Sequence, residues 1–300
     1  MTKLTLQNTQ ILVEINTQGA EILQLRNLIK TQELLWNPDL NYWNRTAPLL
    51  FPIVGRLKDD CYFHNGLKYA MKQHGFARDS KFEVISFNNE QVHLRLTSDE
   101  NTLKQYPFNF QFDVKYTLLQ NQLLAENIIT NLDLQEMPFS FGAHPGFLID
   151  LPLEDCRIQL HGAVGEKLDK ETLKRHLIKD GLYTGDIEEV QLLNGEIVIN
   201  EEYFESDAIV FKNEGITGMS IFQKGEFLVR LDANSAPYWG IWKKQGAPFI
   251  CIEPWWGIAD PIQTNSNILL KNFSQNSSTK EIIFGMDAPI SIACKALPNP

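Results

Sequence analysis

Residues 108–118 read FNFQFDVKYTL, a stretch in which apolar and polar side chains alternate from the first position to the last. A period of two places all the apolar side chains on one face of an extended chain, so this segment is predicted to be a half-buried β-strand. A polar turn at residues 120–122 separates it from a second apolar-rich run over residues 123–131. Two such runs joined by a short polar turn predict a β-hairpin.

Similar short runs recur through the chain and are separated by turns rich in Asn, Gly, Asp and Gln. They cover residues 11–15, 82–87, 92–96, 157–160, 208–211, 219–222, 227–231, 250–253 and 282–284. Helical periodicity is confined to two short segments, residues 102–106 and 171–178. This spacing of strands is typical of a sandwich, and we find no internal repeat or linker. We therefore predict an all-β protein, a large antiparallel β-sandwich that forms a single domain over residues 1–300.

Charge and composition argue against several classes of partner. The chain has 27 basic and 37 acidic residues, a formal net charge of −10, and no run of Lys or Arg long enough to follow a phosphate backbone. Nucleic acid is therefore not an expected partner. No stretch approaches the ~18 apolar residues that span a bilayer, and the N-terminal residues lack the pattern of a secretory signal. We expect no membrane partner and a cytoplasmic protein, either a monomer or a homodimer.

The cysteines point to the same compartment. Cys61, Cys156, Cys251 and Cys294 are widely spaced and form no C-x-x-C pair. This usage predicts reduced, mostly buried thiols in a reducing compartment.

The stretch FICIEPWWG, residues 249–257, is the most informative about chemistry. Its first four residues are all apolar, which predicts a central strand buried on both faces. Glu253 ends that strand, and burial raises the pKa of a carboxyl group toward neutrality, as a general base requires. Trp255 and Trp256 follow, and a flat indole suits the apolar C–H face of a pyranose. The structural alternative makes both tryptophans core residues and Glu253 a hydrogen-bond acceptor.

The stretch FGAHPGF, residues 141–147, sets one ionisable ring among apolar and turn-forming residues. His144 precedes a proline, which favours extended geometry, and Gly142 and Gly146 let the backbone bend on either side. The imidazole is expected to be presented to a site, with a structural histidine as the alternative. An imidazole with the ordinary pKa of ~6.5 can give a proton and take it back near neutral pH.

Two further stretches place cations beside turns. PLLFPIVGRL, residues 48–57, ends with Gly55 and Arg56, where a guanidinium can bind vicinal hydroxyls or phosphate and glycine permits a ligand to approach closely. QHGFAR, residues 73–78, places His74 and Arg78 around a small turn. The alternatives are a surface arginine in the first stretch and a loop with a capping histidine in the second.

These motifs together resemble those of a known family. His74 in HGFAR, His144 in AHPGF and Glu253 in CIEPWWG have the order and approximate spacing seen in the aldose 1-epimerase (galactose mutarotase) family. The wording HPGF with EPWWG is similar to the subgroup encoded with lactose-operon genes. The resemblance covers essentially the whole chain. It implies a large galactose-mutarotase-type β-sandwich that binds the sugar in an open cleft on one sheet, with no cofactor.

The resemblance also implies residue roles. Glu253 matches the general base of the family and His144 its general acid. His74 matches a second active-site histidine that holds the sugar and positions the ring oxygen.

Hydroxyl-binding residues are implied in the same way. Arg56 resembles an arginine that binds sugar hydroxyls, and Trp255 offers the stacking face. Asp207 in ESDAIVF resembles an aspartate that binds hydroxyls from a strand between the acid and the base. Asp232 in VRLDAN competes for that assignment.

The sequence departs from the family at the acid histidine, where AHPGF stands in place of the usual N-H-x-Y-F. HGFAR is also reminiscent of the hexose-6-phosphate mutarotases, in which arginines hold the phosphate, and Arg56 and Arg78 are the candidates here. The substrate is therefore left open between a free aldohexose and a hexose phosphate.

Two other functions stay open. A non-catalytic carbohydrate sensor or binding protein would keep the cleft and bind sugar without anomer exchange. A glycoside hydrolase or lyase would need a second carboxylate beside Glu253, such as Asp232 or Asp260. A metal enzyme is disfavoured because the six histidines form no H-x-H or H-E-x-x-H pattern.

Overall fold

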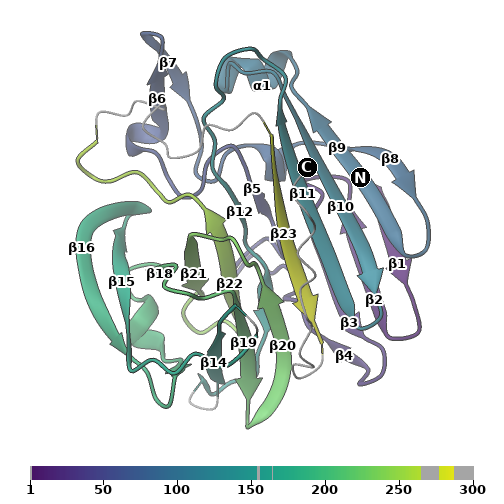
Figure 1. Cartoon of the computed structure of the whole chain (residues 1–300), viewed down its shortest axis with the longest axis vertical. Helices are drawn as coiled ribbons and strands as arrows, with labels where there is room; N and C mark the ends of the chain where they lie inside the picture. Colours follow the sequence, from purple (N-terminus) through teal and green to yellow (C-terminus); the bar gives the residue numbers. More distant parts are fainter. Residues whose placement is uncertain (1, 154–155, 164, 265–276, 287–300) are drawn as a thin grey trace.

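The computed structural model describes residues 2–153, 156–163, 165–264 and 277–286 and consists largely of antiparallel strands (Figure 1). The largest sheet has nine strands. In spatial order they are β17 (Glu196–Val198), β14 (Cys156–His161), β19 (Gly218–Gln223), β20 (Glu226–Asp232), β23 (Ser277–Gly285), β11 (Gln122–Asn131), β10 (Phe110–Leu119), β9 (Gln91–Thr97) and β8 (Glu83–Phe87).

The second sheet has eight strands and carries the candidate site. Its order is β16 (Leu182–Gln191), β15 (Thr172–Lys179), β18 (Ile209–Lys212), β21 (Tyr238–Trp242), β22 (Phe249–Trp256), β12 (Phe141–Ala143) and β5 (Leu49–Leu50), and β13 (Gly146–Leu148) also pairs with β22.

Smaller elements complete the described part of the chain. A four-stranded sheet consists of β1 (Lys3–Gln7), β2 (Ile11–Asn16), β3 (Ile22–Asn27) and β4 (Gln32–Glu33). The hairpin of β6 (Cys61–His64) and β7 (Leu67–Ala70) projects at the top left of Figure 1. The helical segments are α1 (Glu100–Gln105) and the short 3₁₀ turns η1 (Lys58–Asp60), η2 (Ala77–Asp79) and η4 (Glu201–Phe204).

The predicted hairpin is confirmed as β10 and β11. The two strands pair antiparallel along their whole length, with Phe112 opposite Ile129. Phe110 and Phe112 are fully buried, as the alternation predicted, and so is Phe108, which lies just before the strand. The prediction of an all-β, antiparallel sandwich of the galactose-mutarotase type is confirmed.

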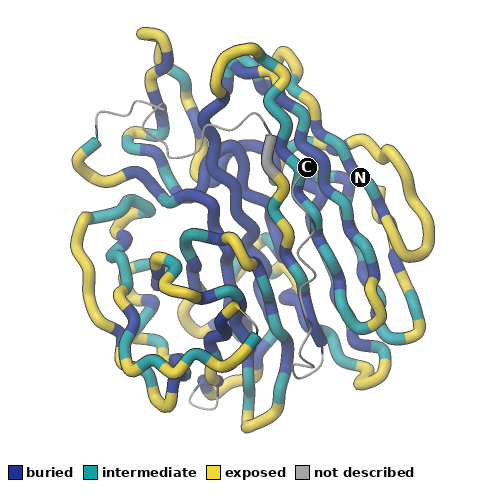
Figure 2. Tube along the Cα trace, viewed as in Figure 1, coloured by how far each residue is buried: buried dark blue, intermediate teal, exposed yellow. Residues whose placement is uncertain are grey.

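The core lies between the sheets. One large apolar cluster takes side chains from the nine-stranded sheet, such as Phe110 and Phe112, and from the eight-stranded sheet, such as Ile250 and Ile252. Figure 2 shows the buried segments gathered between the sheets, whereas the outer strands β8 and β16 are largely exposed.

One of the two helix predictions is confirmed and the other is wrong. Residues 102–106 overlap helix α1, whose first turn is closed by a capping box between Asp99 and Thr102. Residues 171–178 instead form strand β15, which pairs with β16 on one side and β18 on the other. Leu173 and Leu177, four positions apart and followed by Ile178, happened to fit a helical period, but the register shifts between His176 and Ile178 and breaks the alternation of a strand. Long-range pairing overrides local propensity here.

Strand β22 is buried on both faces, as its unbroken apolar run predicted. Its even-numbered side chains enter the main core, namely Ile250, Ile252 and Trp256. Its odd-numbered side chains lie on the opposite face, in two smaller apolar clusters and a pocket, namely Phe249, Cys251, Glu253 and Trp255. The alternation of the strand therefore separates a structural face from a face that holds the candidate site.

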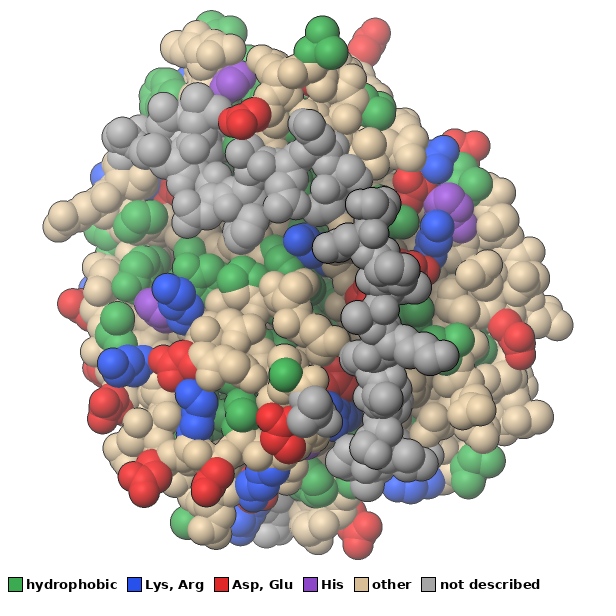
Figure 3. Space-filling model, in the orientation of Figure 1, with side chains coloured by type: hydrophobic (Ala, Val, Ile, Leu, Met, Phe, Trp, Pro, Cys, Tyr) green, Lys and Arg blue, Asp and Glu red, His purple; other side chains and the backbone are tan. Residues whose placement is uncertain are grey.

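On the face of the molecule in Figure 3, Lys and Arg side chains are interspersed with Asp and Glu and form no continuous basic surface. Within the described ranges, no helix combines the length and the apolar character that crossing a membrane requires. Cys61, Cys156 and Cys251 are free and buried thiols, as predicted, and Cys294 lies outside the described residues.

Candidate active site

Strand pairing brings His144 and Glu253 together. Gly142 in β12 lies opposite Trp255, and Gly146 in β13 lies opposite Cys251. Both pairings keep one register, so position 144, in the gap between β12 and β13, falls opposite position 253. The backbone is held on its other edge as well, because the His144 N–H donates to the carbonyl of Pro48 at 3.1 Å. The two candidate residues are therefore cross-strand neighbours, whose Cβ atoms lie ~4.5–5.5 Å apart in such pairs.

The two side chains are in contact. His144 Nε2 lies 3.2 Å from Glu253 Oε2, which also accepts a hydrogen bond from the Trp255 Nε1–H at 3.2 Å. Glu253 is only 1% exposed and His144 9% exposed. Glu253 Oε1 and His144 Nδ1 are buried and have no hydrogen-bond partner in the described part of the chain. Because buried polar atoms are rarely left unpaired, these atoms indicate a place for a polar ligand.

Burial shifts both groups toward their neutral forms. It raises the pKa of Glu253 well above 4.5, an effect that the Trp255 hydrogen bond opposes. It lowers the pKa of His144 to about 3, so the ordinary value expected from sequence does not apply. At a pH above the lowered pKa of His144 and below the raised pKa of Glu253, the pair holds one exchangeable proton. The 3.2 Å contact lets the two groups share that proton.

His74 is held in an unusual backbone conformation next to this pair. Its φ of 66° lies in the left-handed region, and it exchanges hydrogen bonds with Gly55: the His74 N–H donates to the Gly55 carbonyl, and the Gly55 N–H donates to His74 Nδ1 at 3.2 Å. Because Nδ1 accepts, the proton of the neutral ring is on Nε2. Gly75 is required here, since a Cβ would lie 2.2 Å from the Phe51 carbonyl oxygen.

The rings of His74 and His144 meet edge to face, with centroids 5.7 Å apart. Burial lowers the pKa of His74 well below 6.5, and the neighbouring His144 adds to this effect. Near neutral pH His74 is therefore an uncharged donor beside the His144–Glu253 pair.

Trp255 lies against two glycines of neighbouring strands. A Cβ on Gly142 of β12 would lie 2.8 Å from the indole Cδ1, and a Cβ on Gly240 of β21 would lie 2.9 Å from Cζ2. Both flanking strands thus leave room for the indole, which directs its N–H to Glu253. Trp256, in contrast, is in the main core, so the structural alternative applies to that tryptophan.

The side chains of Glu253, His144, His74 and Trp255 line one pocket with a volume of about 260 Å³. Its lining residues are Trp43, Gly55, Gln73, His74, Arg78, His144, Ile178, Gly181, Asp207, Ala208, Trp242, Glu253, Trp255 and Ala259. Six of the seven nominated side chains are therefore brought together, and Arg56 is the exception.

Trp43 and Trp242 belong to the pocket but were not nominated from the sequence. The Trp43 ring lies 4.9 Å from the His144 ring at 30°, and the Trp242 ring lies 5.6 Å from it, edge to face. Trp43 follows a polar loop and Trp242 ends a short strand, and neither position carries a motif. The only signal was their residue type, since tryptophan is common in sugar-binding sites.

Arg78 and Asp207 are the other ionisable side chains of the pocket, in addition to Glu253 and the two histidines. Arg78 Nη2 donates to the Gln73 carbonyl at 2.7 Å, and its Nε is buried without a partner in the described residues. Burial and the nearby Arg45 lower the pKa of Arg78. Burial raises the pKa of Asp207, although the N–H groups of Ala208 and Gly181 favour its charged form.

Arg56 is placed differently. Its guanidinium binds both carboxylate oxygens of Asp60 at 2.8 Å and is not among the groups lining the pocket. The glycine before it serves chain packing as well as the pocket, because a Cβ on Gly55 would lie 2.6 Å from that of Ala259.

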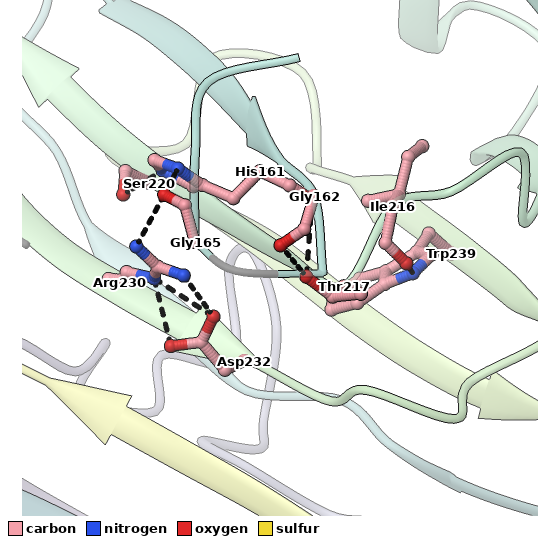
Figure 4. Close-up of polar contacts among 9 residues, drawn as sticks. All are labelled: His161, Gly162, Gly165, Ile216, Thr217, Ser220, Arg230, Asp232 and Trp239. Atoms are coloured by element: carbon pink, nitrogen blue, oxygen red, sulfur yellow. Dashed lines mark hydrogen bonds and ion pairs between the residues drawn. The ribbon is translucent and has the colours of Figure 1, made fainter. Parts of the chain in front are cut away.

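Asp232, the competitor of Asp207, does not line the pocket. Figure 4 shows its carboxylate beside Arg230. Its carboxylate binds the Arg230 guanidinium at 2.6–2.9 Å, and Arg230 also reaches the Gly165 carbonyl. Asp260 likewise does not line the pocket, and its Oδ2 accepts the Lys58 N–H at 3.1 Å. Neither carboxylate named for a hydrolase therefore faces the pocket with Glu253.

Fold and pocket together define a β-sandwich of the galactose-mutarotase type. The chain belongs to the aldose 1-epimerase family, whose sequence model matches residues 2–265. It is 27% identical over 286 residues to the chromosomal LacX protein of Lactococcus lactis subsp. lactis, an alignment that covers 88% of this chain and 90% of that protein. This likeness agrees with the resemblance to the lactose-operon subgroup.

Solved structures extend the comparison. A galactose mutarotase related enzyme from Lactobacillus acidophilus is 30% identical, with a TM-score of 0.88 over 96% of this chain and 98% of that chain. A galactose mutarotase-like protein from Lactobacillus casei is 27% identical, with a TM-score of 0.85 over 95% of this chain and 99% of that chain.

Proposed function

We propose that the protein is an aldose 1-epimerase that interconverts the α and β anomers of an aldohexose by general acid–base ring opening. The observation that carries the proposal is the contact between His144 Nε2 and Glu253 Oε2 at 3.2 Å, buried in a pocket lined by tryptophans. An acid and a base so close together can reach the two oxygens of one hemiacetal, which share a single carbon atom.

The proposed reaction moves one proton through the sugar. The Glu253 carboxylate accepts the proton of the C1 hydroxyl, the bond between C1 and the ring oxygen breaks, and protonated His144 gives its proton to the ring oxygen. The products are the free aldehyde, a neutral imidazole and a protonated carboxyl group. Rotation about C1–C2 turns the carbonyl over, and the reverse transfers close the ring as the other anomer.

The His144–Glu253 pair carries one exchangeable proton both with the cyclic sugar and with the open-chain aldehyde, and only the position of that proton changes. Burial favours the neutral form, which is the form that the open-chain aldehyde meets. The cyclic sugar requires the charged form, which the polar groups of a bound sugar would stabilise in place of water. Because the aldehyde itself is the electrophile, this chemistry needs no cofactor.

The remaining pocket residues are proposed to bind the sugar. His74, with its proton on Nε2, would donate to the ring oxygen or a hydroxyl, and Arg78 and Asp207 would bind hydroxyls from the opposite side. Trp255 would contact the apolar face of the ring. We propose that the protein acts in the cytoplasm.

The test follows anomer exchange by polarimetry or NMR exchange spectroscopy over a panel of aldohexoses. Glu253→Gln and His144→Asn should each lose about 10²- to 10⁴-fold in rate, since each removes one acid–base partner, with sugar binding largely retained in calorimetry. His64→Asn, a buried histidine outside the pocket, is the control and should keep the wild-type rate. Wild-type rates in both pocket variants would refute the roles. Sugar binding without exchange by the wild type would favour a non-catalytic sugar-binding protein.

One observation favours a second candidate, a hexose-6-phosphate mutarotase. In the described part of the chain no carboxylate lies within 4.0 Å of the Arg78 guanidinium, because Asp79 and Glu21 are paired with Arg45. A cation without a paired anion in a pocket favours an anionic substrate group.

The two candidates differ in how they respond to the loss of Arg78. Arg78→Ala should lower kcat/KM for a 6-phosphorylated hexose by about 10- to 100-fold, the value of a charged hydrogen bond, if Arg78 binds phosphate. An equal effect on free and phosphorylated sugars would favour the free sugar. Arg56→Ala is the matched comparison, because its guanidinium is already bound to Asp60.

A further inference from the structure

Beneath the proposed acid–base pair lies a buried thiol that the reaction does not use. Cys251 precedes Glu253 by two positions on β22, so both side chains lie on the same face of the strand. The thiol is fully buried, in a cluster with Trp36, Phe249 and the half-buried Trp43 and Trp242. One donor atom from each of His144, Cys251 and Glu253 lies within 4.8 Å of the other two.

A second observation is an unpaired carboxylate oxygen within this group of donors. Glu253 Oε1 is buried without a partner in the described residues, whereas Oε2 faces His144 Nε2 and Trp255 Nε1. Glu253 is 1% exposed, so water does not hydrate this oxygen, and a buried polar atom of this kind is rarely left without a partner. A sugar hydroxyl can satisfy such an atom, and so can a cation.

We propose that His144, Cys251 and Glu253 form a binding site for a thiophilic divalent cation such as Zn²⁺ or Cd²⁺, which enters through the sugar pocket and excludes the sugar. Imidazole, thiolate and carboxylate are the donors that such ions prefer. Three protein ligands leave the fourth tetrahedral position open toward the pocket, where water completes the coordination.

The geometry requires a small contraction. Bond lengths of about 2.0–2.3 Å place the ligand atoms of a tetrahedral zinc site ~3.5 Å apart. The His144 Nε2–Glu253 Oε2 contact at 3.2 Å already meets this requirement, and Cys251 Sγ, within 4.8 Å of a donor atom of each, need move by little more than an ångström at most. Rotation of the side chains supplies such a movement.

Charge balance favours the same ion. On binding, the thiol and the carboxyl group release their protons to solvent, and the imidazole binds as the neutral ring. A divalent cation then meets two negative ligands, and the buried site carries no net charge. A monovalent cation would leave a buried negative charge, which is costly without a partner.

Metal binding is tested first without any activity assay. Calorimetric titration of the metal-free protein with Cd²⁺ and with Zn²⁺ should give one site per chain, and Cd²⁺ should produce the ultraviolet absorption of a cadmium–thiolate bond. Cys251→Ala should lose affinity by more than the ~10- to 100-fold typical of an outer-shell change and should lose the absorption. Cys156→Ala, which removes a fully buried thiol outside the pocket, is the matched control and should bind as the wild type does.

The effect on the sugar rests on the proposed function and is measured separately. Cd²⁺ should raise the apparent KM of anomer exchange in the wild type, and Cys251→Ala should keep its activity and be insensitive to Cd²⁺. A wild-type protein without a cadmium–thiolate absorption refutes the site, whether or not the protein is an epimerase. Equal loss of affinity in Cys156→Ala refutes the assignment to Cys251. If Cd²⁺ binds but no sugar is turned over, the proposed function fails and the metal site stands.

Discussion

Gly240→Ala should damage catalysis through a residue that touches no substrate. Gly240 lies opposite Glu253 in the β21–β22 pairing, under the indole of Trp255. An alanine Cβ there would lie 2.9 Å from Cζ2 and 3.2 Å from Cη2, whereas real Cβ atoms rarely have contacts closer than 3.4 Å. The indole must therefore retreat from the strand by about 0.5 Å.

Two consequences can be estimated from that displacement. The hydrogen bond from Trp255 Nε1 to Glu253 Oε2 is already 3.2 Å long, and a shift of about 0.5 Å carries it past the usual limit for a hydrogen bond. The carboxyl group then loses a side-chain donor that stabilises its charged form. We expect kcat/KM to fall by about 10- to 100-fold, because misplacement by ~1 Å costs about 100-fold. Overpacking should lower the free energy of unfolding by ~1–3 kcal/mol.

Anomer exchange and urea unfolding are the two measurements. Gly285→Ala is the matched control, because Gly285 also lies in a strand, β23, but its nearest neighbours to an added Cβ are 3.9 Å away. That variant should keep the wild-type rate and lose little stability. A Gly240→Ala protein with the wild-type rate would refute the claim that the position of Trp255 controls Glu253.

Three further predictions concern the shared proton. The pH profile of kcat/KM should show no acid limb near pH ~6.5, because burial lowers the pKa of His144 to about 3, and an acid limb at that pH would contradict the buried pair. The folded-state pKa of Glu253 is raised, so the stability that this carboxyl group contributes is lost as pH rises. The unfolding free energy of Glu253→Gln relative to that of the wild type should therefore grow above pH ~4.5, as measured by urea unfolding at several pH values. A difference that stays constant with pH would refute this prediction. The double variant His144→Asn/Glu253→Gln should be little slower than either single variant, since the two act as a unit, and multiplicative losses would indicate independent roles.

The sequence predicted the strands whose side chains are patterned by burial. Phe110 and Phe112 alternate with polar residues because one face of β10 meets the core, and the apolar run of β22 reflects burial on both faces. The ribbon of β15 and β16 was not predicted as strands, because it lies at the edge of its sheet and has few fully buried positions to impose a pattern. There, the spacing of Leu173 and Leu177 was mistaken for that of a helix.

The site was predictable in residue type but not in geometry. Motifs around His144 and Glu253 identified both residues, but their contact depends on a register between strands distant in the chain, which composition does not encode. Trp43 was missed because it lies in a loop, where no period marks a residue. The nomination of Arg56 relied on its neighbour Gly55, yet the adjacent Asp60 binds its guanidinium.

The pocket is lined by two kinds of segment, paired strands, such as the ladder that joins β12 and β13 to β22, and the loops that connect strands. His144 and Glu253 are fixed by hydrogen-bonded backbone before and after them, whereas Trp43, Gln73 and Asp207 stand on connecting segments. Connecting segments tolerate exchange and insertion far better than paired strands do. Descendants of this scaffold can therefore change the lining of the pocket by altering loops while the distance between His144 and Glu253 is inherited intact.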